Sequence, residues 1–255
     1  MQKNRKDRLV SIVTPIYNGE VFVAETIETV LAQTYENWEW IIVDDGSRDR
    51  TREIIRDAAK KDKRIRLVKL AGNGGAAKAR NAGIMAMKGK YLCFLDADDL
   101  WAPEKIAKQV KFMSEEGCAF SFTGYEFADA FGKPNGKVVR VPAEISYKQA
   151  LKNTTIWTST VMLDMEKLAK EDVLMPDVAS EDTATWWKLL KMVNYAYGLN
   201  EVLSYYRRSG QTLSSNKLVA IKRIWALYRN YEKLNLAQSF VNFVGYATNA
   251  VRRRV

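Results

Sequence analysis

Apolar and polar residues along the first 95 positions alternate between short continuous apolar runs and helical repeats. Four runs typical of buried strands occur at residues 9–14, 38–43, 65–70 and 91–95. Between them lie three stretches with apolar residues at helical spacing, at residues 20–33, 49–61 and 76–87. This alternation predicts an α/β fold, with a mostly parallel sheet, helices on both faces and ligand binding beyond the carboxyl ends of the strands.

The pattern is less regular after residue 100. We expect helices at 103–116 and 181–193, strands at 119–123, 159–163 and 202–207, a turn at 132–136 and two late helices. We expect a catalytic domain at residues 1–213, with a nucleotide-binding half (1–100) and an acceptor half (101–213). A C-terminal helical extension at 214–255 follows it.

Composition limits the chemistry. The 255 residues are 47% hydrophobic and 27% charged, which is typical of a folded globular chain and not of a disordered one. The chain has no histidine, which excludes Ser-His-Asp and Cys-His nucleophiles, histidine-ligated zinc and histidine-bound haem. Acid-base and metal chemistry must therefore rest mainly on carboxylates. Cys93 and Cys118 lie in apolar surroundings and are expected to be buried thiols, not a disulfide.

The net charge of +10 is concentrated late in the chain. Residues 217–255 hold eight Lys or Arg against one acid, Glu232, and apolar residues recur there at helical spacing. One interpretation is a helix packed on the core with a solvated basic side. The other is an interfacial helix on an anionic membrane leaflet, where each basic residue contributes about 1 kcal/mol.

No targeting segment is expected. The basic residues 3–8 precede an apolar run at 9–13 that is too short for a signal peptide and lacks a cleavage site. No run reaches the ~20 apolar residues that cross a bilayer. We therefore expect a cytoplasmic protein, with peripheral contact at the inner face of the cell membrane left open.

Polar clusters follow three of the predicted strands. They are listed here in chain order: Thr14–Asn18, Asp44–Asp49 and Asp96–Asp99. Each cluster alone is typical of a turn followed by a helix cap. Their coincidence at one sheet edge instead favours a ligand site. If the strand continues, Asp96 and Asp98 project to the same side and can share Mg²⁺ or Mn²⁺ together with a phosphate ester.

Five motifs carry a family resemblance. In order and spacing they are Thr14-Pro-Ile-Tyr-Asn18, Val43-Asp-Asp-Gly-Ser-Arg-Asp-Arg-Thr51, Ala79-Arg-Asn-Ala-Gly83, Leu95-Asp-Ala-Asp-Asp99 and Ser180-Glu-Asp182. The set resembles the family 2 glycosyltransferases of GT-A fold over essentially the whole chain, above all bacterial teichuronic acid and capsular polysaccharide enzymes. The resemblance implies metal-dependent, inverting transfer of a sugar from a nucleotide diphosphate, foremost a UDP-sugar. The implied acceptor is a glycan or an undecaprenyl-linked sugar, in cell-surface polysaccharide synthesis.

The resemblance also implies roles for residues of the donor site. Thr14 and Tyr17 would line the nucleotide pocket, and Asp45 would accept hydrogen bonds from the base. Arg80 lies in a helix that follows a glycine-rich loop and begins near the same edge of the sheet. It could either bind the donor or have a structural role.

Three more implied roles belong to the aspartates after residue 95. Asp96 would lie beside the ribose, Asp98 would ligate the Mn²⁺ or Mg²⁺ that bridges the donor diphosphate, and Asp99 would support that arrangement. These roles come from the family pattern and not from the spacing alone.

The base of an inverting transfer needs a second acidic site. The family has it in a Glu-Asp pair at a helix start, which here implies Asp182, next to Glu181. Helical spacing puts Asp182 on the same face as Trp186 and Leu189, so it should point toward the protein or a cleft. The alternative is ordinary helix capping, with Ser180 as the cap and two acids in the first turn.

One position departs from the family. Many relatives carry a histidine shortly after the arginine that Arg207 matches, whereas this chain has Arg208 and Ser209. Either the metal has fewer protein ligands, or Arg207 and Arg208 neutralise the phosphates directly.

Two other functions compete with sugar transfer. Residues 72–77 follow a strand and open a helix, with Asp96 at the distance of a ribose-binding acid, which resembles the glycine-rich loop of an NAD-dependent oxidoreductase. A non-catalytic basic protein that binds a membrane or nucleic acid would explain the charge. No nucleic-acid-binding motif accompanies it, so we expect no nucleic-acid partner.

Overall fold

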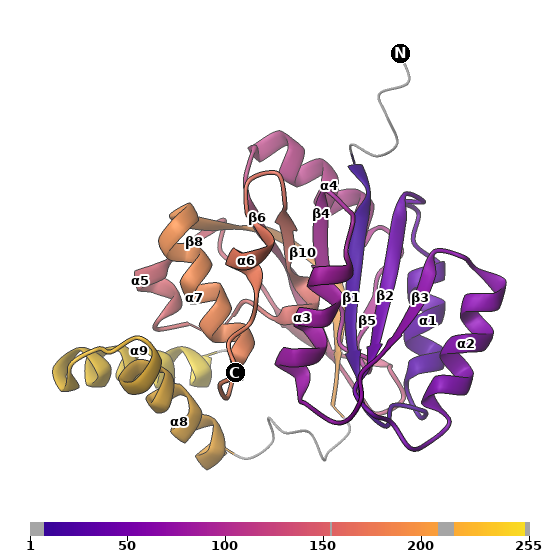
Figure 1. The fold of residues 1–255 in the computed structure, drawn as a ribbon. Coiled ribbons are helices and arrows are strands. Elements are labelled where there is room, and N and C mark those ends of the chain that lie inside the picture. Colours follow the sequence, from indigo (N-terminus) through magenta and orange to yellow (C-terminus); the bar gives the residue numbers. More distant parts are fainter. Residues whose placement is uncertain (1–7, 154, 209–216, 253–255) are drawn as a thin grey trace.

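The computed structural model describes residues 8–153, 155–208 and 217–252, which build one sheet with helices on both faces (Figure 1). Its first half consists of β1 (Val10–Ile16), β2 (Trp38–Asp44), β3 (Ile65–Lys69) and β4 (Tyr91–Phe94). These strands are parallel, in the order β3-β2-β1-β4. The parallel α/β arrangement expected from the alternating pattern is therefore confirmed.

The same sheet continues through the second half of the chain. β9 (Met162–Asp164) lies antiparallel between β4 and β6 (Phe120–Ala128), and β10 (Tyr195–Arg207) runs parallel to β6. Three short strands complete the sheet: β5 (Leu100–Trp101), β7 (Pro134–Val139) and β8 (Glu144–Ser146). The two expected halves thus share one continuous set of backbone hydrogen bonds.

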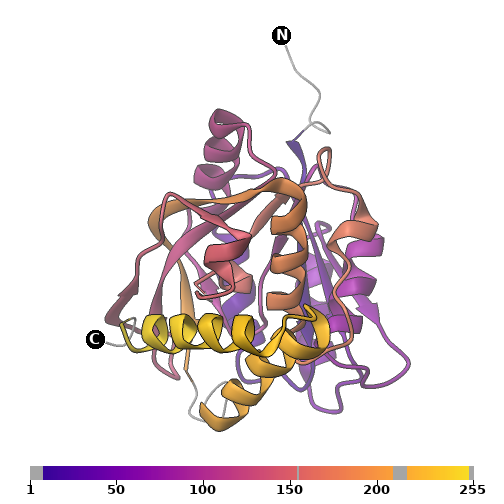
Figure 2. The ribbon, with the colours of Figure 1, turned by 90° about the vertical axis from the view of Figure 1, so that its left-hand side faces the viewer.

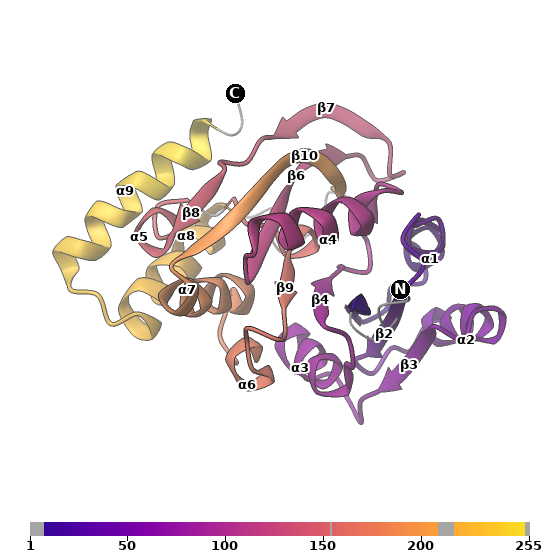
Figure 3. The same cartoon turned by 90° about the horizontal axis from the view of Figure 1, so that it is seen from above.

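The helices cover the two faces in separate groups (Figure 3). One face carries α1 (Val23–Leu31), α2 (Thr51–Lys61) and α4 (Lys105–Glu116), whose apolar residues share a buried cluster. The other carries α3 (Ala76–Ala86) and α7 (Glu181–Val193), with the short helices α5 (Tyr147–Ala150) and α6 (Lys170–Val173). Apolar residues fill both faces, as expected for a sheet of buried parallel strands.

Helix α3 packs very closely on the sheet because of one glycine. A Cβ atom at Gly83 would lie 2.4 Å from Cγ1 of Val13 on β1, closer than nonbonded carbon atoms can approach. The absent side chain lets the helix backbone contact the strand directly. This contact fixes where the first turn of α3 meets the sheet edge, and with it the position of Arg80.

The C-terminal helices pack on the core. α8 (Lys217–Ala226), one π-helical turn (η3, Leu227–Tyr231) and α9 (Leu236–Arg252) follow each other, and α9 crosses the face seen in Figure 2. The ring of Tyr228 is fully buried and stacks on Trp187 of α7, with centroids 5.4 Å apart and planes 3° apart. The interpretation as a helix packed on the core is therefore confirmed for α8 and η3. No helix in the described part of the chain is long and apolar enough to span a bilayer.

Element boundaries differ from the expected ones mainly after residue 100. The strand expected at 202–207 is part of a 13-residue β10, and the strand expected at 159–163 is a short β9 preceded by a 3₁₀ turn at Thr158–Thr160 (η2). The turn near Gly132 does form, between β6 and β7. Both cysteines are buried and free, as expected.

Candidate active site

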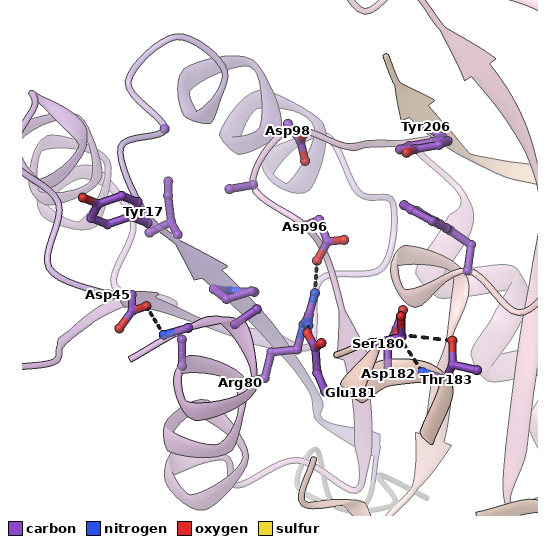
Figure 4. A pocket seen from close by; sticks show the side chains of 18 of the residues that line it. Tyr17, Asp45, Arg80, Asp96, Asp98, Ser180, Glu181, Asp182, Thr183 and Tyr206 are labelled. Atoms are coloured by element: carbon purple, nitrogen blue, oxygen red, sulfur yellow. Dashed lines mark hydrogen bonds and ion pairs between the residues drawn. The ribbon is translucent and has the colours of Figure 1, made fainter. Parts of the chain in front are cut away.

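A cleft of about 800 Å³ opens where the carboxyl ends of β1, β2 and β4 face the first turn of α7. Figure 4 shows Tyr17 and Asp45 at one end, Asp96 and Asp98 along one side, and Asp182 at the other end. The sequence placed these residues after three different strands and at one helix start. Parallel strands bring them together because their carboxyl ends share one edge of the sheet.

Asp45 is nearly buried in the cleft wall, and the loop before α3 holds its carboxylate. Oδ1 accepts a hydrogen bond from the backbone N–H of Gly74 at 2.8 Å, and Oδ2 accepts one from Gly75 at 2.7 Å. Gly75 has φ +89°, a conformation that glycine adopts without strain. The glycine-rich loop therefore binds a protein carboxylate. Tyr17, 46% exposed, lines the same end of the cleft.

Thr14 does not reach the cleft. Its side chain is fully buried within β1, and its Oγ1 accepts a hydrogen bond from Nε1 of Trp40 at 2.9 Å. Successive residues of a strand point to opposite faces, and Thr14 shares its face with Ile12 and Ile16, which pack beneath α1 and α2. The expectation that Thr14 lines the nucleotide pocket is corrected accordingly.

The aspartates after β4 lie in a turn and not on a continued strand. β4 ends at Phe94, and the N–H of Asp99 donates to the carbonyl of Asp96 at 3.1 Å. Asp96 and Asp98 nevertheless both line the cleft. Asp99 is buried behind them, where its Oδ2 accepts hydrogen bonds from Ser159 Oγ at 2.5 Å and Trp157 Nε1 at 2.9 Å. The supporting role expected for Asp99 thus corresponds to contacts that hold this turn.

Burial and the repulsion of neighbouring carboxylates raise the pKa of Asp98 and of Asp99. Desolvation, followed by the charge of Asp96, raises the pKa of Asp98 to about 6. Desolvation, with the charges of Asp98 and Asp96, raises the pKa of Asp99 well above its usual value. A cation bound nearby would stabilise the charged forms of these crowded carboxylates and so lower their pKa.

Arg80 lies between the two acidic groups of the cleft. Its two terminal nitrogens bind Asp96 Oδ1 and Glu181 Oε1, each at 2.6 Å, and the residue is only 5% exposed (Figure 4). Burial disfavours its charge, but Asp96 and Glu181 outweigh this effect and raise the pKa of Arg80. Burial also raises the pKa of Glu181, and Arg80 opposes that shift. Arg80 therefore joins the turn after β4 to the first turn of α7.

Asp182 faces the cleft from the start of α7. Its Oδ2 accepts a hydrogen bond from Thr158 Oγ1 at 2.9 Å, and its Oδ1 accepts one from the N–H of Thr183 at 2.6 Å. Ser180, at the cap position, has a left-handed backbone with φ 62° and no capping hydrogen bond from its side chain. Asp182 is thus oriented by Thr158 and Thr183 and not used as a helix cap.

Arg207 stabilises the turn that follows β4. It is 1% exposed, its Nε donates to the carbonyl of Asp98 at 2.8 Å, and its Nη2 binds Glu25 Oε2 at 2.6 Å. It does not line the cleft, so the expected donor contact is corrected. Arg208 lies over the ring of Phe127 at 4.1 Å, and Ser209 lies outside the described residues.

The carboxylates fit a divalent cation that also binds a ligand. Among the described residues, no group of three or more acidic, cysteine or histidine side chains converges as a closed metal site. Asp98 faces the cleft, and Asp96 lies next to it with one oxygen bound to Arg80. Mg²⁺ and Mn²⁺ are commonly held by one or two carboxylates together with substrate phosphates, so this donor set matches an open site and not a closed one.

The far wall of the cleft contains residues that sequence reasoning missed. Trp157 and Tyr206 pack against each other there, with ring centroids 4.1 Å apart and planes tilted by 38°, and Arg223 of α8 and Tyr246 of α9 complete that side. Trp157 lies two residues before the strand expected at 159–163, and Tyr206 directly precedes Arg207, but neither was predicted to face the cleft. Nothing local in the sequence connects α8 and α9 with the cleft.

These features define a nucleotide-sugar transferase of GT-A architecture, and the comparisons with known proteins agree. Residues 11–174 match the model of glycosyl transferase family 2. The chain belongs to this family and is a glycosyltransferase. The competing interpretations as an NAD-dependent oxidoreductase or a non-catalytic basic protein are not favoured.

Curated relatives cover nearly the whole chain. TuaG of Bacillus subtilis (strain 168), named for glycosyl transfer in teichuronic acid biosynthesis, is 44% identical over 97% of this chain and 98% of its own. WfgD of Escherichia coli is a UDP-Glc:alpha-D-GlcNAc-diphosphoundecaprenol beta-1,3-glucosyltransferase. It is 36% identical over 92% of this chain and 90% of its own.

Solved structures share the fold at low sequence identity. TarS of S. aureus (residues 1–349, with UDP-GlcNAc) superposes with a TM-score of 0.71 and 20% identity, covering 94% of this chain and 72% of that one. The mannosyltransferase PcManGT of Pyrobaculum calidifontis, with GDP-Man and Mn²⁺, gives 0.69 and 17%, covering 96% and 70%. The GT-A fold expected from the sequence motifs is confirmed.

Proposed function

We propose that this glycosyltransferase moves a sugar from a UDP-sugar to a sugar on a diphospholipid of the undecaprenyl type, with inversion, during cell-surface polysaccharide synthesis. The observation that carries the proposal is the presence of two separate carboxylate groups in one cleft, Asp98 after β4 and Asp182 at the start of α7. A metal-dependent inverting transfer needs one carboxylate to hold the cation that neutralises the departing diphosphate, and another to accept the proton of the acceptor hydroxyl. The relatives named above support the donor and acceptor classes.

The donor end has a role for each aspartate. Asp45, with Tyr17, would receive the nucleoside end, and Asp96 would lie beside the ribose. Asp98 would hold Mn²⁺ or Mg²⁺, which neutralises the charge that builds up on the leaving diphosphate. Arg80 would set the distance between this end and α7, since its guanidinium already binds Asp96 and Glu181.

The acceptor end carries the proton transfer. Asp182 would take the proton of the acceptor hydroxyl as its oxygen forms a bond to the anomeric carbon. The bond from that carbon to the diphosphate breaks at the same time, and its electron pair leaves with UDP. Thr158 and Thr183 orient the carboxylate for this step.

The proposal also covers the domain organisation of the chain and its place in the cell. Residues 1–213 would form the catalytic domain, and 214–255 an extension that supplies one wall of its cleft and attaches to the inner face of the cell membrane. The support is an exposed apolar side of α9 made of Leu236, Phe240, Val241 and Val244, which are 49–66% exposed, in a region with seven net positive charges. An amphipathic helix with basic neighbours suits an anionic lipid surface.

The proposal is tested by UDP binding in a titration calorimeter, with and without Mn²⁺. We expect Mn²⁺ to strengthen UDP binding to the wild-type protein at least ~10-fold, and Asp98→Asn to remove that gain. NAD serves as the comparison ligand. Equal UDP affinity with and without the metal, or NAD binding as tight as UDP binding, would contradict the proposal.

A further inference from the structure

The side chains that line the cleft carry unequal charge. Five carboxylates line it, from Asp45, Asp96, Asp98, Glu181 and Asp182, against two guanidinium groups, from Arg80 and Arg223. The charge of Arg80 is paired with Asp96 and Glu181 through its two terminal nitrogens, and its Nε is buried without a hydrogen-bond partner. The side chain of Arg223, within α8, makes no hydrogen bond or ion pair with any residue that the structure describes. It is therefore the cleft's one cation, within the described ranges, that no carboxylate neutralises.

The position of Arg223 is fixed by the packing of its helix. Ala220, Arg223 and Ile224 are three and four residues apart on α8, so one side of this helix forms the cleft wall. Ile224 is 4% exposed and belongs to the core that contains Trp187 and Tyr228. Lys222, one residue earlier, is exposed and does not line the cleft. The two neighbouring cations thus face different surroundings.

A guanidinium on a cleft wall suits a phosphate group, since its planar donors bind phosphate oxygens in pairs. Two diphosphates enter the reaction under the proposed function, one on the donor and one on the lipid acceptor. The donor diphosphate belongs beside Asp98, on the β4 side. Arg223 and Tyr246 come from α8 and α9, and α9 also carries the exposed apolar residues. The acceptor is the substrate whose diphosphate adjoins a lipid chain.

We propose that Arg223 is the binding residue for the diphosphate of the lipid-linked acceptor. This inference rests on the proposed function and extends it by giving the C-terminal helices a part in acceptor choice. The sugar hydroxyl lies at Asp182, the diphosphate meets Arg223 on α8, and the lipid chain leaves along the apolar side of α9.

The test compares Arg223→Gln with Lys222→Gln, which removes the same charge from the exposed side of α8. The direct probe is farnesyl diphosphate, titrated into protein already saturated with UDP and Mn²⁺ so that the donor site is filled. Farnesol is the probe without phosphate. We expect Arg223→Gln to weaken farnesyl diphosphate binding at least ~10-fold, with Lys222→Gln within about twofold of the wild type. Farnesol binding should be the same in all three proteins.

A kinetic arm separates the two diphosphates. Arg223→Gln should raise KM for an acceptor sugar on a prenyl diphosphate at least ~10-fold and leave the donor KM and the KM for the same sugar on an octyl group unchanged. A raised donor KM, an equal rise for both acceptors, or unchanged farnesyl diphosphate binding would each overturn the inference. The farnesyl diphosphate titration does not depend on sugar transfer, so it tests the inference separately. Absence of metal-dependent UDP binding in the wild-type protein would instead overturn the proposed function. Thermal midpoints equal to that of the wild type would show that the fold of both variants is intact.

Discussion

Asp182 shows how neighbouring side chains give one carboxylate its orientation. Two threonines contact it, and it faces the open cleft from a helix start that uses no side-chain cap. A carboxylate held in this way is positioned to receive a proton from a hydroxyl within hydrogen-bond reach. Because the donor-site aspartates come from other elements, the proton-transfer step can be removed without disturbing donor binding.

We therefore expect Asp182→Asn to lower kcat by ~10² to 10⁴ while UDP affinity in the presence of Mn²⁺ changes less than about twofold. Initial-rate kinetics and calorimetry measure the two quantities. Asp177→Asn is the matched control, because Asp177 is an exposed acid five residues earlier in the same segment. Turnover near the wild-type rate in Asp182→Asn would refute its role as the base.

Lys105 gives a second expectation at this scale, on stability. It is fully buried, its Nζ lies 3.8 Å from the ring centroid of Trp101 and 3.6 Å from Cys93 Sγ, and no carboxylate among the described residues pairs with it. Burial lowers the pKa of this lysine from its usual 10.5. The unfolded chain therefore binds the proton more tightly than the folded one, and stability should rise as pH rises from the lowered pKa toward 10.5.

Replacing Lys105 by Met should remove the free-energy cost of burying a charged ammonium group. We expect the free energy of unfolding near pH 7 to increase by ~1 kcal/mol, which raises the thermal midpoint by about 2–4 °C. The advantage of Lys105→Met over the wild type should shrink toward pH 10. An advantage that is the same at pH 7 and pH 10 would show that lysine protonation is not its cause.

At the scale of elements, the contact of α3 with β1 sets the position of Arg80. Gly83 permits the contact, and the helix then carries Arg80 to Asp96 and Glu181. The size of residue 83 therefore affects how closely α3 packs on β1, and through that packing the ion pairs of Arg80 with Asp96 and Glu181. The effect of enlarging it should appear in both stability and donor binding.

Gly83→Ala should lower the free energy of unfolding by about 1–3 kcal/mol, since its Cβ would overlap Val13, and should weaken UDP binding through Arg80. Chemical denaturation and calorimetry measure these changes. The double variant Gly83→Ala/Val13→Ala provides the space again and should recover UDP affinity relative to Gly83→Ala. Additive losses in the double variant would contradict the proposed overlap.

The elements that sequence could predict are those with local patterns. The alternation of strands and helices gave β1 to β4 and α1 to α3, and short motifs identified Asp45, Asp98 and Asp182. Thr14 was misplaced because a motif does not state which face of its strand a residue occupies. Arg207 was misplaced because its partner Glu25 lies 182 residues away. Arg223 and Tyr246 could not be predicted for the same reason, because they reach the cleft through long-range packing of the C-terminal helices, such as that of Tyr228 on Trp187.

At the scale of the whole molecule, the proposed membrane contact of α9 places the cleft beside a lipid surface. Phe240→Glu/Val244→Glu should weaken sedimentation with vesicles of 30% anionic lipid at least ~10-fold, because two exposed apolar side chains become charged. Val138→Glu is the control, since Val138 is an exposed apolar residue on β7. Binding of the double variant equal to that of this control would contradict the contact.

The C-terminal helices also determine when a newly made chain becomes competent. Residues between 220 and 246 complete the cleft, although the aspartates at its other end lie in the first hundred positions. During synthesis these helices are the last of the described elements to leave the ribosome, so the cleft is complete only after they have emerged. Termination of the chain ahead of residue 220 would therefore remove this wall of the cleft and uncover the face of Trp187 on which Tyr228 stacks.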